Sequence, residues 1–230
     1  MKLFVGTSGY AYKEWRGHFY PEKLKEADML EYYGKQLSTV EINNTFYRMP
    51  KEEVLLGWAK KVPASFRFTL KASRRITHQL RLRDCADPLA YLLKTAAVLD
   101  KKLGALLFQM PPNLKLDLER LQEFLDLIPK KTRAAFEFRH LSWFDDAVYD
   151  ELKKRNFALC YSDGEVEGEP FVSTADWGYL RLRQESYDED ALKSEADRIK
   201  ATAWKSVYVY FKHEEAGIGA RLAKKFLTFF

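Results

Sequence analysis

The sequence is poor in cysteine and has no long hydrophobic runs. Cys85 and Cys160 are the two cysteines among 230 residues, and no C-x-x-C spacing occurs. A secreted disulfide framework is therefore not expected, and a reducing cytoplasm is the simpler location. The first residues, "MKLFVGTSGY", reach Gly6 after an apolar run too short for a signal-peptide core. Charges interrupt the other apolar runs before bilayer length, so no membrane partner is expected.

Linkers, low-complexity tracts and glycine-rich phosphate loops are also missing. "GTSGY" at 6–10 is neither G-x-G-x-x-G nor G-x-S-x-G, so Ser8 is interpreted as a turn residue rather than a nucleophile. No shift in composition marks a boundary, and residues 1–230 are expected to form a single domain. The net charge of +5 fits a small anionic ligand; nucleic acid is an alternative partner that no motif supports.

Short apolar runs alternate with helical patterns along the whole chain. This alternation predicts parallel βαβ units, and eight of them in 230 residues fit a TIM-type (β/α)8 barrel with parallel strands. An open doubly wound sheet is the alternative, although it would contain fewer strands. Strands are expected at 3–7, 38–43, 66–71, 105–110, 134–138, 157–161, 179–182 and 206–211. Helices are expected at 25–37, 51–61, 87–101, 117–128, 145–155, 188–204 and 216–228. The helix between the sixth and seventh strands, which is not among these seven, is expected to be short or irregular.

Polar side chains recur at the carboxyl ends of these strands. In "TVEINNTFYRMP", Glu41 and Asn43 share one face of a strand whose other face is apolar, because side chains alternate along a strand. The same spacing predicts an inward polar face on the other strands, and barrel enzymes place their sites at this mouth. The predicted set is Thr7, Glu41 with Asn43, Thr69 with Lys71, Leu107 with Gln109, Glu137 with Arg139, Tyr161 with Asp163, Arg181 with Arg183, and Tyr210 with Lys212.

Two loops add candidate ligand contacts. The loop from Ser8 to Leu24 contains Tyr10 and Trp15, whose rings could stack on a ligand or cap the barrel. The segment "KASRRITHQLRLRDC" places Arg74 and His78 shortly after a strand end. Because guanidinium groups bind phosphate or carboxylate through two hydrogen bonds, an anionic or phosphorylated ligand is expected.

Two kinds of role remain open for the charged mouth. In an enzyme that acts on a small or nucleic-acid-derived phosphorylated substrate, Glu41 or Glu137 would act as general acid or base. Lys71 and Arg139 would stabilise negative charge, and Arg181 would position the anion. As a binding module, the same residues would hold an anionic metabolite without reaction. A structural lattice of ion pairs is the plain alternative. If the mouth is open to solvent, replacing Glu41 with Gln should cost less than about 2 kcal/mol of stability.

A metal-dependent, endonuclease-like barrel is a further alternative. Glu41, Glu137, Asp163 and His140 could meet and hold Mg²⁺ or Mn²⁺, but neighbouring cations compete for these carboxylates. No H-E-x-x-H or paired-cysteine spacing occurs, so no cofactor is predicted and a divalent metal stays an alternative.

Several motifs together resemble one known family. "TVEINNTFYRMP", "KASRRITH", "KLGALLFQMPP", "AFEFRHLSW" and "TADWGYLRLR" are similar to the domain of unknown function 72 family, the YecE-like proteins. The resemblance runs from about Leu3 to the C-terminus and implies a variant TIM-type barrel without an established activity. It also implies a shared polar mouth that includes, besides residues already named, Tyr47, Arg48, Thr77, His140 and Trp143. The chain departs from the family pattern at Arg183-Gln184 and at Lys212-His213, both expected at the mouth.

Overall fold

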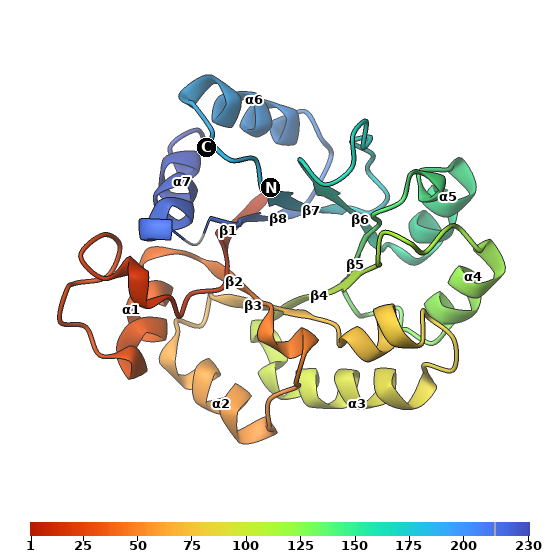
Figure 1. Cartoon of the computed structure of the whole chain (residues 1–230), viewed down its shortest axis with the longest axis horizontal. Coiled ribbons are helices and arrows are strands. Elements are labelled where there is room, and N and C mark those ends of the chain that lie inside the picture. Colours follow the sequence, from red (N-terminus) through yellow and green to blue (C-terminus); the bar gives the residue numbers. More distant parts are fainter. Residues whose placement is uncertain (214) are drawn as a thin grey trace.

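Eight parallel strands close into a barrel in the computed structural model, which describes residues 1–213 and 215–230 (Figure 1). Strands that follow one another in the chain are neighbours in the sheet, and β8 pairs with β1 to close it. The predicted TIM-type barrel is thereby confirmed. The strands are β1 (Lys2–Ser8), β2 (Thr39–Ile42), β3 (Arg67–Lys71), β4 (Leu103–Gln109), β5 (Ala134–Glu137), β6 (Ala158–Ser162), β7 (Trp177–Leu182) and β8 (Ser206–Phe211).

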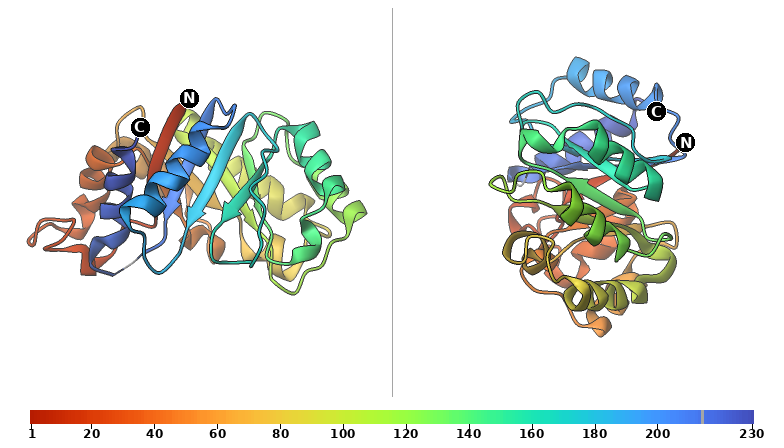
Figure 2. Two further views of the ribbon diagram at one scale, coloured as in Figure 1. Left: turned by 90° about the horizontal axis from the view of Figure 1, so that it is seen from above. Right: turned by 90° about the vertical axis from the view of Figure 1, so that its right-hand side faces the viewer.

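Helices surround the barrel on its outside (Figure 2). They follow the expected pattern, each lying between two successive strands except the last, which follows β8. The exception predicted at the sixth position is confirmed, because residues 163–176, all of them described, connect β6 to β7 through turns and extended chain. The helices are α1 (Met29–Gln36), α2 (Glu52–Lys61), α3 (Ala86–Ala96), α4 (Leu118–Asp126), α5 (Asp146–Arg155), α6 (Glu189–Lys200) and α7 (Ile218–Leu227).

Two apolar layers hold the fold together. The larger lies between the outer faces of the strands and the helices, and it includes Val40, Phe68, Phe136, Leu180 and Val209. The smaller fills the inside of the barrel with side chains of alternating size, as a packed barrel requires. Its members are Phe4, Ala105, Leu107, Ala135, Ala158, Cys160, Trp177, Tyr179, Tyr208 and Tyr210, with Ala175 beside them.

Two expected strand orientations are wrong. On β1, Thr7 points outward and bonds the hydroxyl of Tyr33 in α1, whereas Ser8 ends the strand buried inside. The alternation explains this result: Leu3 and Val5 belong to the outer apolar layer, so odd-numbered residues face out. Ser8 is therefore an interior strand residue, not the turn residue that the motif comparison suggested.

On β6 the expected inward pair Tyr161 and Asp163 is also misplaced. Ala158 and Cys160 face the barrel interior, so Tyr161 faces outward and packs against Phe171. The guanidinium of Arg198 in α6 lies 5.3 Å from the centre of the Tyr161 ring. These groups cover the outer side of β6, where a helix would otherwise lie.

The state of the cysteines and the character of the helices match what the composition led us to expect. Cys85 and Cys160 are both free and buried. In the part of the chain that the structure describes, the helices are too short or too polar to cross a bilayer.

Candidate functional site

A buried ion-pair cluster lies inside the carboxyl end of the barrel. Arg181 of β7 donates from Nη2 to Glu41 Oε1 at 2.9 Å and from Nη1 to Glu137 Oε2 at 2.6 Å. Glu41 also accepts from Ser8 Oγ at 2.7 Å and from the hydroxyl of Tyr179 at 2.5 Å. The two carboxylates are 0% exposed and Arg181 is 2% exposed, so solvent does not screen the charges.

The charges in this cluster stabilise one another. Burial alone would raise the pKa of Glu137, but the nearby Arg181, Arg139 and Arg183 outweigh it and hold the pKa at about 2. Burial likewise opposes ionisation of Glu41, while Arg181 and the hydrogen bond from Tyr179 bring its pKa below the ordinary value. Both carboxylates are therefore ionised at neutral pH and paired with a permanent cation.

A chain of side-chain hydrogen bonds leads from this cluster to the opening of the barrel. Gln109 donates from Nε2 to Glu137 Oε1, and Lys71 Nζ donates to Gln109 Oε1, each at 2.8 Å. Lys71 also lies 4.3 Å from the ring centre of Phe46. Burial and the charge of Arg181 lower the pKa of Lys71 to about 8. The chain ends in an amine that is half-buried and mostly, but not fully, protonated near neutral pH.

Two further cations share a carboxylate from the β6–β7 connection. Arg139 donates from Nε to Glu137 Oε1 at 3.0 Å, and its Nη2 lies 3.1 Å from Glu165 Oε2. Arg183 Nη1 pairs with the other oxygen of Glu165 and lies 3.8 Å from Glu137 Oε1. Glu165 thus occupies the place that an anion bound by two guanidinium groups would take.

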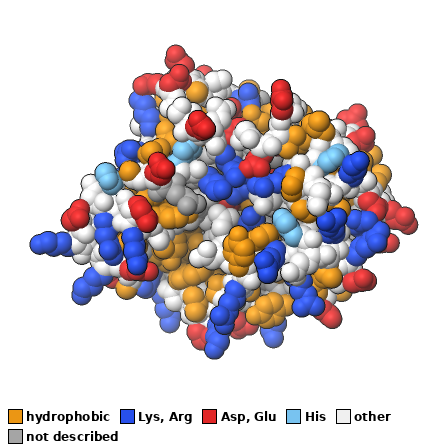
Figure 3. Space-filling model, viewed as in Figure 1, with side chains coloured by type: hydrophobic (Ala, Val, Ile, Leu, Met, Phe, Trp, Pro, Cys, Tyr) orange, Lys and Arg blue, Asp and Glu red, His pale blue; other side chains and the backbone are white. Residues whose placement is uncertain are grey.

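Figure 3 views the molecule from the same side as Figure 1 and shows Lys and Arg side chains gathered near the middle of this face. Acidic side chains lie beside them. Lys71, Arg139 and Arg183, which lie at the carboxyl end of the barrel, are each only partly buried.

The structure brings together six of the predicted site residues and places Asp163 apart from them. The six are Glu41, Lys71, Gln109, Glu137, Arg139 and Arg181. Asp163 lies at the same end of the barrel but accepts from the backbone amide of Arg183 and from the hydroxyl of Tyr187. It therefore orders the start of the β7–α6 connection rather than joining the ion-pair cluster.

Two predicted aromatic contacts are core residues. Trp15 and Trp143 are 0% exposed. The Trp143 ring stacks on Phe138 with the ring centres 4.5 Å apart, and its indole nitrogen donates to Leu114 O at 2.6 Å. Trp15 packs edge-on against Phe19. Packing accounts for both residues without a ligand.

The remaining predicted contacts surround the mouth. Tyr10 and Asn43 line a small cavity between the β1–α1 and β2–α2 connections, and Oδ1 of Asn43 is buried there without a hydrogen-bond partner among the described residues. The imidazole of His78 packs edge-on against Phe46, and Thr77 is buried and bonds His78 Nδ1. The others lie nearer the surface: Tyr47, Arg48, Arg74 and Lys212 are exposed, and half-buried His140 bonds Ser142.

Three contributors to the cluster were not among the predicted site residues. They are Ser8, Tyr179 and Glu165, whereas Arg183 was expected at the mouth together with Arg181 and does join the cluster. Tyr179 shares the face of Arg181, so the alternation of β7 was a sufficient signal for it. Glu165 lies on a connection without secondary structure, and its sequence context contains no such signal.

No group of three or more His, Cys, Asp or Glu side chains within 1–213 and 215–230 is arranged to hold a metal ion. The side chains that the sequence offered as metal ligands bond other protein groups instead. Glu41 and Glu137 bond arginine, and His140 bonds Ser142.

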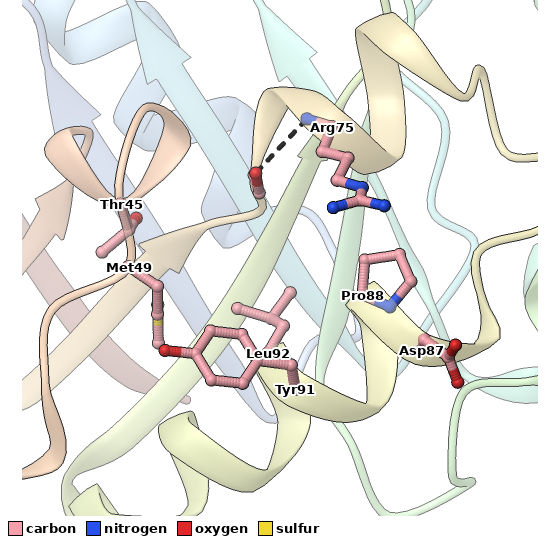
Figure 4. A pocket seen from close by; sticks show the side chains of 8 residues that line it. Thr45, Met49, Arg75, Asp87, Pro88, Tyr91 and Leu92 are labelled. Atoms are coloured by element: carbon pink, nitrogen blue, oxygen red, sulfur yellow. Dashed lines mark hydrogen bonds between the residues drawn. The ribbon is translucent and has the colours of Figure 1, made fainter.

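A separate hollow of about 380 Å³ lies beside the β3–α3 connection (Figure 4). Figure 4 shows the side chains of Met49, Tyr91 and Leu92 together at one side and Arg75 above Pro88 at the other. Its lining contains none of the six clustered residues, so the hollow is distinct from the ionic mouth.

Comparisons with known proteins agree on one family. The YecE protein of Escherichia coli K12, named as a UPF0759 protein, is 34% identical over 127 residues, which are 55% of this chain and 47% of that protein. The matched segment thus spans about half the length of that relative. A DUF72 family protein from Thermotoga maritima has a solved structure with a TM-score of 0.80 and 25% identity, covering 99% of this chain and 98% of that one.

A DUF72 family protein from Enterococcus faecalis V583 shares the fold, with a TM-score of 0.82 at 19% identity over 99% of this chain and 94% of that one. The family model described as "protein of unknown function DUF72" matches residues 4–230. The chain therefore belongs to the DUF72 family.

Proposed function

We propose that the barrel mouth binds a small phosphorylated or carboxylated molecule and acts on it. The observation that carries this proposal is the pairing of Arg139 and Arg183 with the two oxygens of Glu165. A phosphate or carboxylate group presents the same paired oxygens, so it can replace Glu165 between the two guanidinium groups. Glu165 comes from a connection rather than from a strand, which makes it the replaceable partner.

The buried cluster supports this site from below. Glu137 holds Arg139 in place and Arg181 holds Glu137, so the cations above them are fixed before a ligand arrives. The general acid-base role expected for Glu41 or Glu137 is not retained. Both carboxylates are fully buried and hydrogen-bonded, and a pKa near 2 makes Glu137 a poor base at neutral pH. In this proposal Lys71 and Arg139 contact the ligand, and Arg181 acts through Glu137.

The proposal is tested by adding inorganic phosphate while following thermal unfolding. A ligand that binds only the folded protein raises the midpoint, by an amount set by RT ln(1 + [L]/Kd). We expect a rise at millimolar phosphate with sodium chloride at equal ionic strength as the control. Arg139→Gln should remove the rise, whereas Arg74→Gln, which changes an exposed arginine outside the cluster, should retain it. An unchanged midpoint at tens of millimolar phosphate would contradict the proposal.

A binding module without catalysis is the second candidate function. It is favoured by the hydrogen bonds that both oxygens of Glu41 accept from buried partners, which make this carboxylate a poor proton acceptor. Assays of the purified protein against a panel of phosphoesters separate the two functions. Turnover that Lys71→Met abolishes supports the enzyme, and phosphate binding without turnover of any ester supports the module. Elemental analysis of the same sample tests the metal-dependent alternative.

A further inference from the structure

Lys71 differs from the other cations of the mouth in what anchors it. Its Nζ donates to the neutral carbonyl oxygen of Gln109 rather than to a carboxylate. The side-chain amide of Gln109 cannot flip without losing a hydrogen bond, because its nitrogen donates to Glu137 Oε1. The fixed side-chain amide of Gln109 therefore orients the Lys71 amine. It uses one of the three hydrogen-bonding positions of that amine and leaves the other two.

The surroundings of Lys71 favour an amine that carries a lone pair. Burial and the nearby cations Arg181 and Arg139 favour the uncharged amine, whereas the carboxylates Glu137 and Glu41 and the ring of Phe46 favour the charged form. Burial together with the charge of Lys71 lowers the pKa of the His78 imidazole. With a pKa of about 8, roughly a tenth of Lys71 is uncharged at pH 7, compared with fewer than about one in a thousand of ordinary lysines.

Desolvation beside other cations is one established way to make a lysine nucleophilic. We propose that Lys71 is the nucleophile of this site and forms an imine with a small aldehyde or ketone bearing a phosphate or carboxylate. The inference rests on the proposed anion site, because Arg139 and Arg183 would hold the charged end of that molecule.

The chemistry balances without another reactant. The lone pair of Nζ attacks the carbonyl carbon, the carbonyl electron pair moves to oxygen, and a proton passes from nitrogen to that oxygen to give a carbinolamine. The oxygen then leaves as water with the second amine hydrogen, and a C=N bond remains. Glu137 and Glu41 would compensate the positive charge when the imine is protonated.

Reductive trapping tests the proposal. The protein is incubated with glycolaldehyde phosphate or with uncharged glycolaldehyde, each with sodium cyanoborohydride, and labelled lysines are located by mass spectrometry. Lys102 is the matched internal control, since it is also half-buried but donates to the backbone carbonyls of Ala59 and Val62. We expect Lys71 to be labelled at least about tenfold faster than Lys102, because burial beside Arg181 leaves roughly a tenth of Lys71 uncharged at pH 7.

The two probes separate this inference from the anion site. The phosphorylated probe should label Lys71 faster than the uncharged probe does, and inorganic phosphate should slow it. Equal rates with the two probes, both ahead of Lys102, would support the nucleophile and contradict the anion site. Labelling of Lys71 no faster than Lys102 by either probe overturns the nucleophile, while the thermal experiment with phosphate still decides the anion site. Lys71→Arg should lose the label at this position, while Lys102 is labelled as before.

Discussion

At the scale of single residues, Arg181 determines what the mouth can do. One guanidinium lies between two carboxylates that solvent does not reach, and removing either partner would leave a buried charge without compensation. The residues that solvent does reach, Lys71 and Arg139, depend on this arrangement for their positions. The buried ion pairs of Arg181 therefore fix the positions of Lys71 and Arg139, which are the side chains that a ligand could reach.

Replacing Glu41 with Gln should lower the free energy of unfolding by about 3–5 kcal/mol, the usual cost of breaking a buried pair. The sequence suggested a loss below about 2 kcal/mol on the premise of an open mouth, and the complete burial of Glu41 removes that premise. Urea denaturation of the two proteins measures the difference. The matched control is Glu31→Gln, which breaks a solvent-exposed ion pair with Lys35 and should leave the free energy of unfolding nearly unchanged. Equal small losses in both variants would contradict the structural role of Glu41.

At the scale of elements, the β6–β7 connection is where this barrel departs from a regular alternation. It contains no helix in residues 163–176, and instead it delivers Glu165 to the mouth. Burial raises the pKa of Glu169 on the same segment to about 8, while one of its oxygens accepts from the Ser162 amide. Under the proposed function, an anionic ligand would displace the Glu165 carboxylate of this connection from its two arginines.

Glu165→Gln should strengthen phosphate binding. The substitution removes a carboxylate that competes for Arg139 and Arg183, and partly exposed ion pairs are worth up to about 1 kcal/mol, or about fivefold in affinity. Isothermal titration with phosphate measures the change. Glu167→Gln is the matched control, because Glu167 is an exposed carboxylate of the same connection and forms no ion pair with any residue that the structure describes. Weaker binding by Glu165→Gln would show that Glu165 belongs to the binding site itself.

The elements also show how far the sequence could predict the fold and the site. Strand and helix alternation identified the barrel and the missing helix, because periodicity is a local property of the chain. The inward faces of β1 and β6 were misjudged because each strand was oriented by the polar residue nearest its end. Thr7 is polar yet bonds Tyr33 outside the barrel, and Tyr161 packs outward where no helix lies. The role of Glu165 depends on how a connection folds over the mouth, which local patterns do not encode.

At the scale of the whole molecule, hydrogen bonds across the barrel interior join its last strand to strands near its beginning. The hydroxyl of Tyr210 in β8 bonds Thr39 Oγ1 of β2 at 2.8 Å and Thr69 Oγ1 of β3 at 2.7 Å. All three residues are 0% exposed. These bonds lie beneath the ionic mouth, so they test whether the scaffold and the site can be separated.

Tyr210→Phe should lower the free energy of unfolding by about 1–3 kcal/mol, because it leaves buried threonine hydroxyls short of a partner. The ring is retained, so the interior packing around Tyr179 and the slope of unfolding with urea should not change. Phosphate affinity should also stay within error of the parent protein, since the substitution alters no charge and none of the ionic contacts of Arg139 and Arg183. A change in affinity at unchanged slope would instead show that the tyrosine layer sets the position of Glu41 and, through Arg181, of the cations above it.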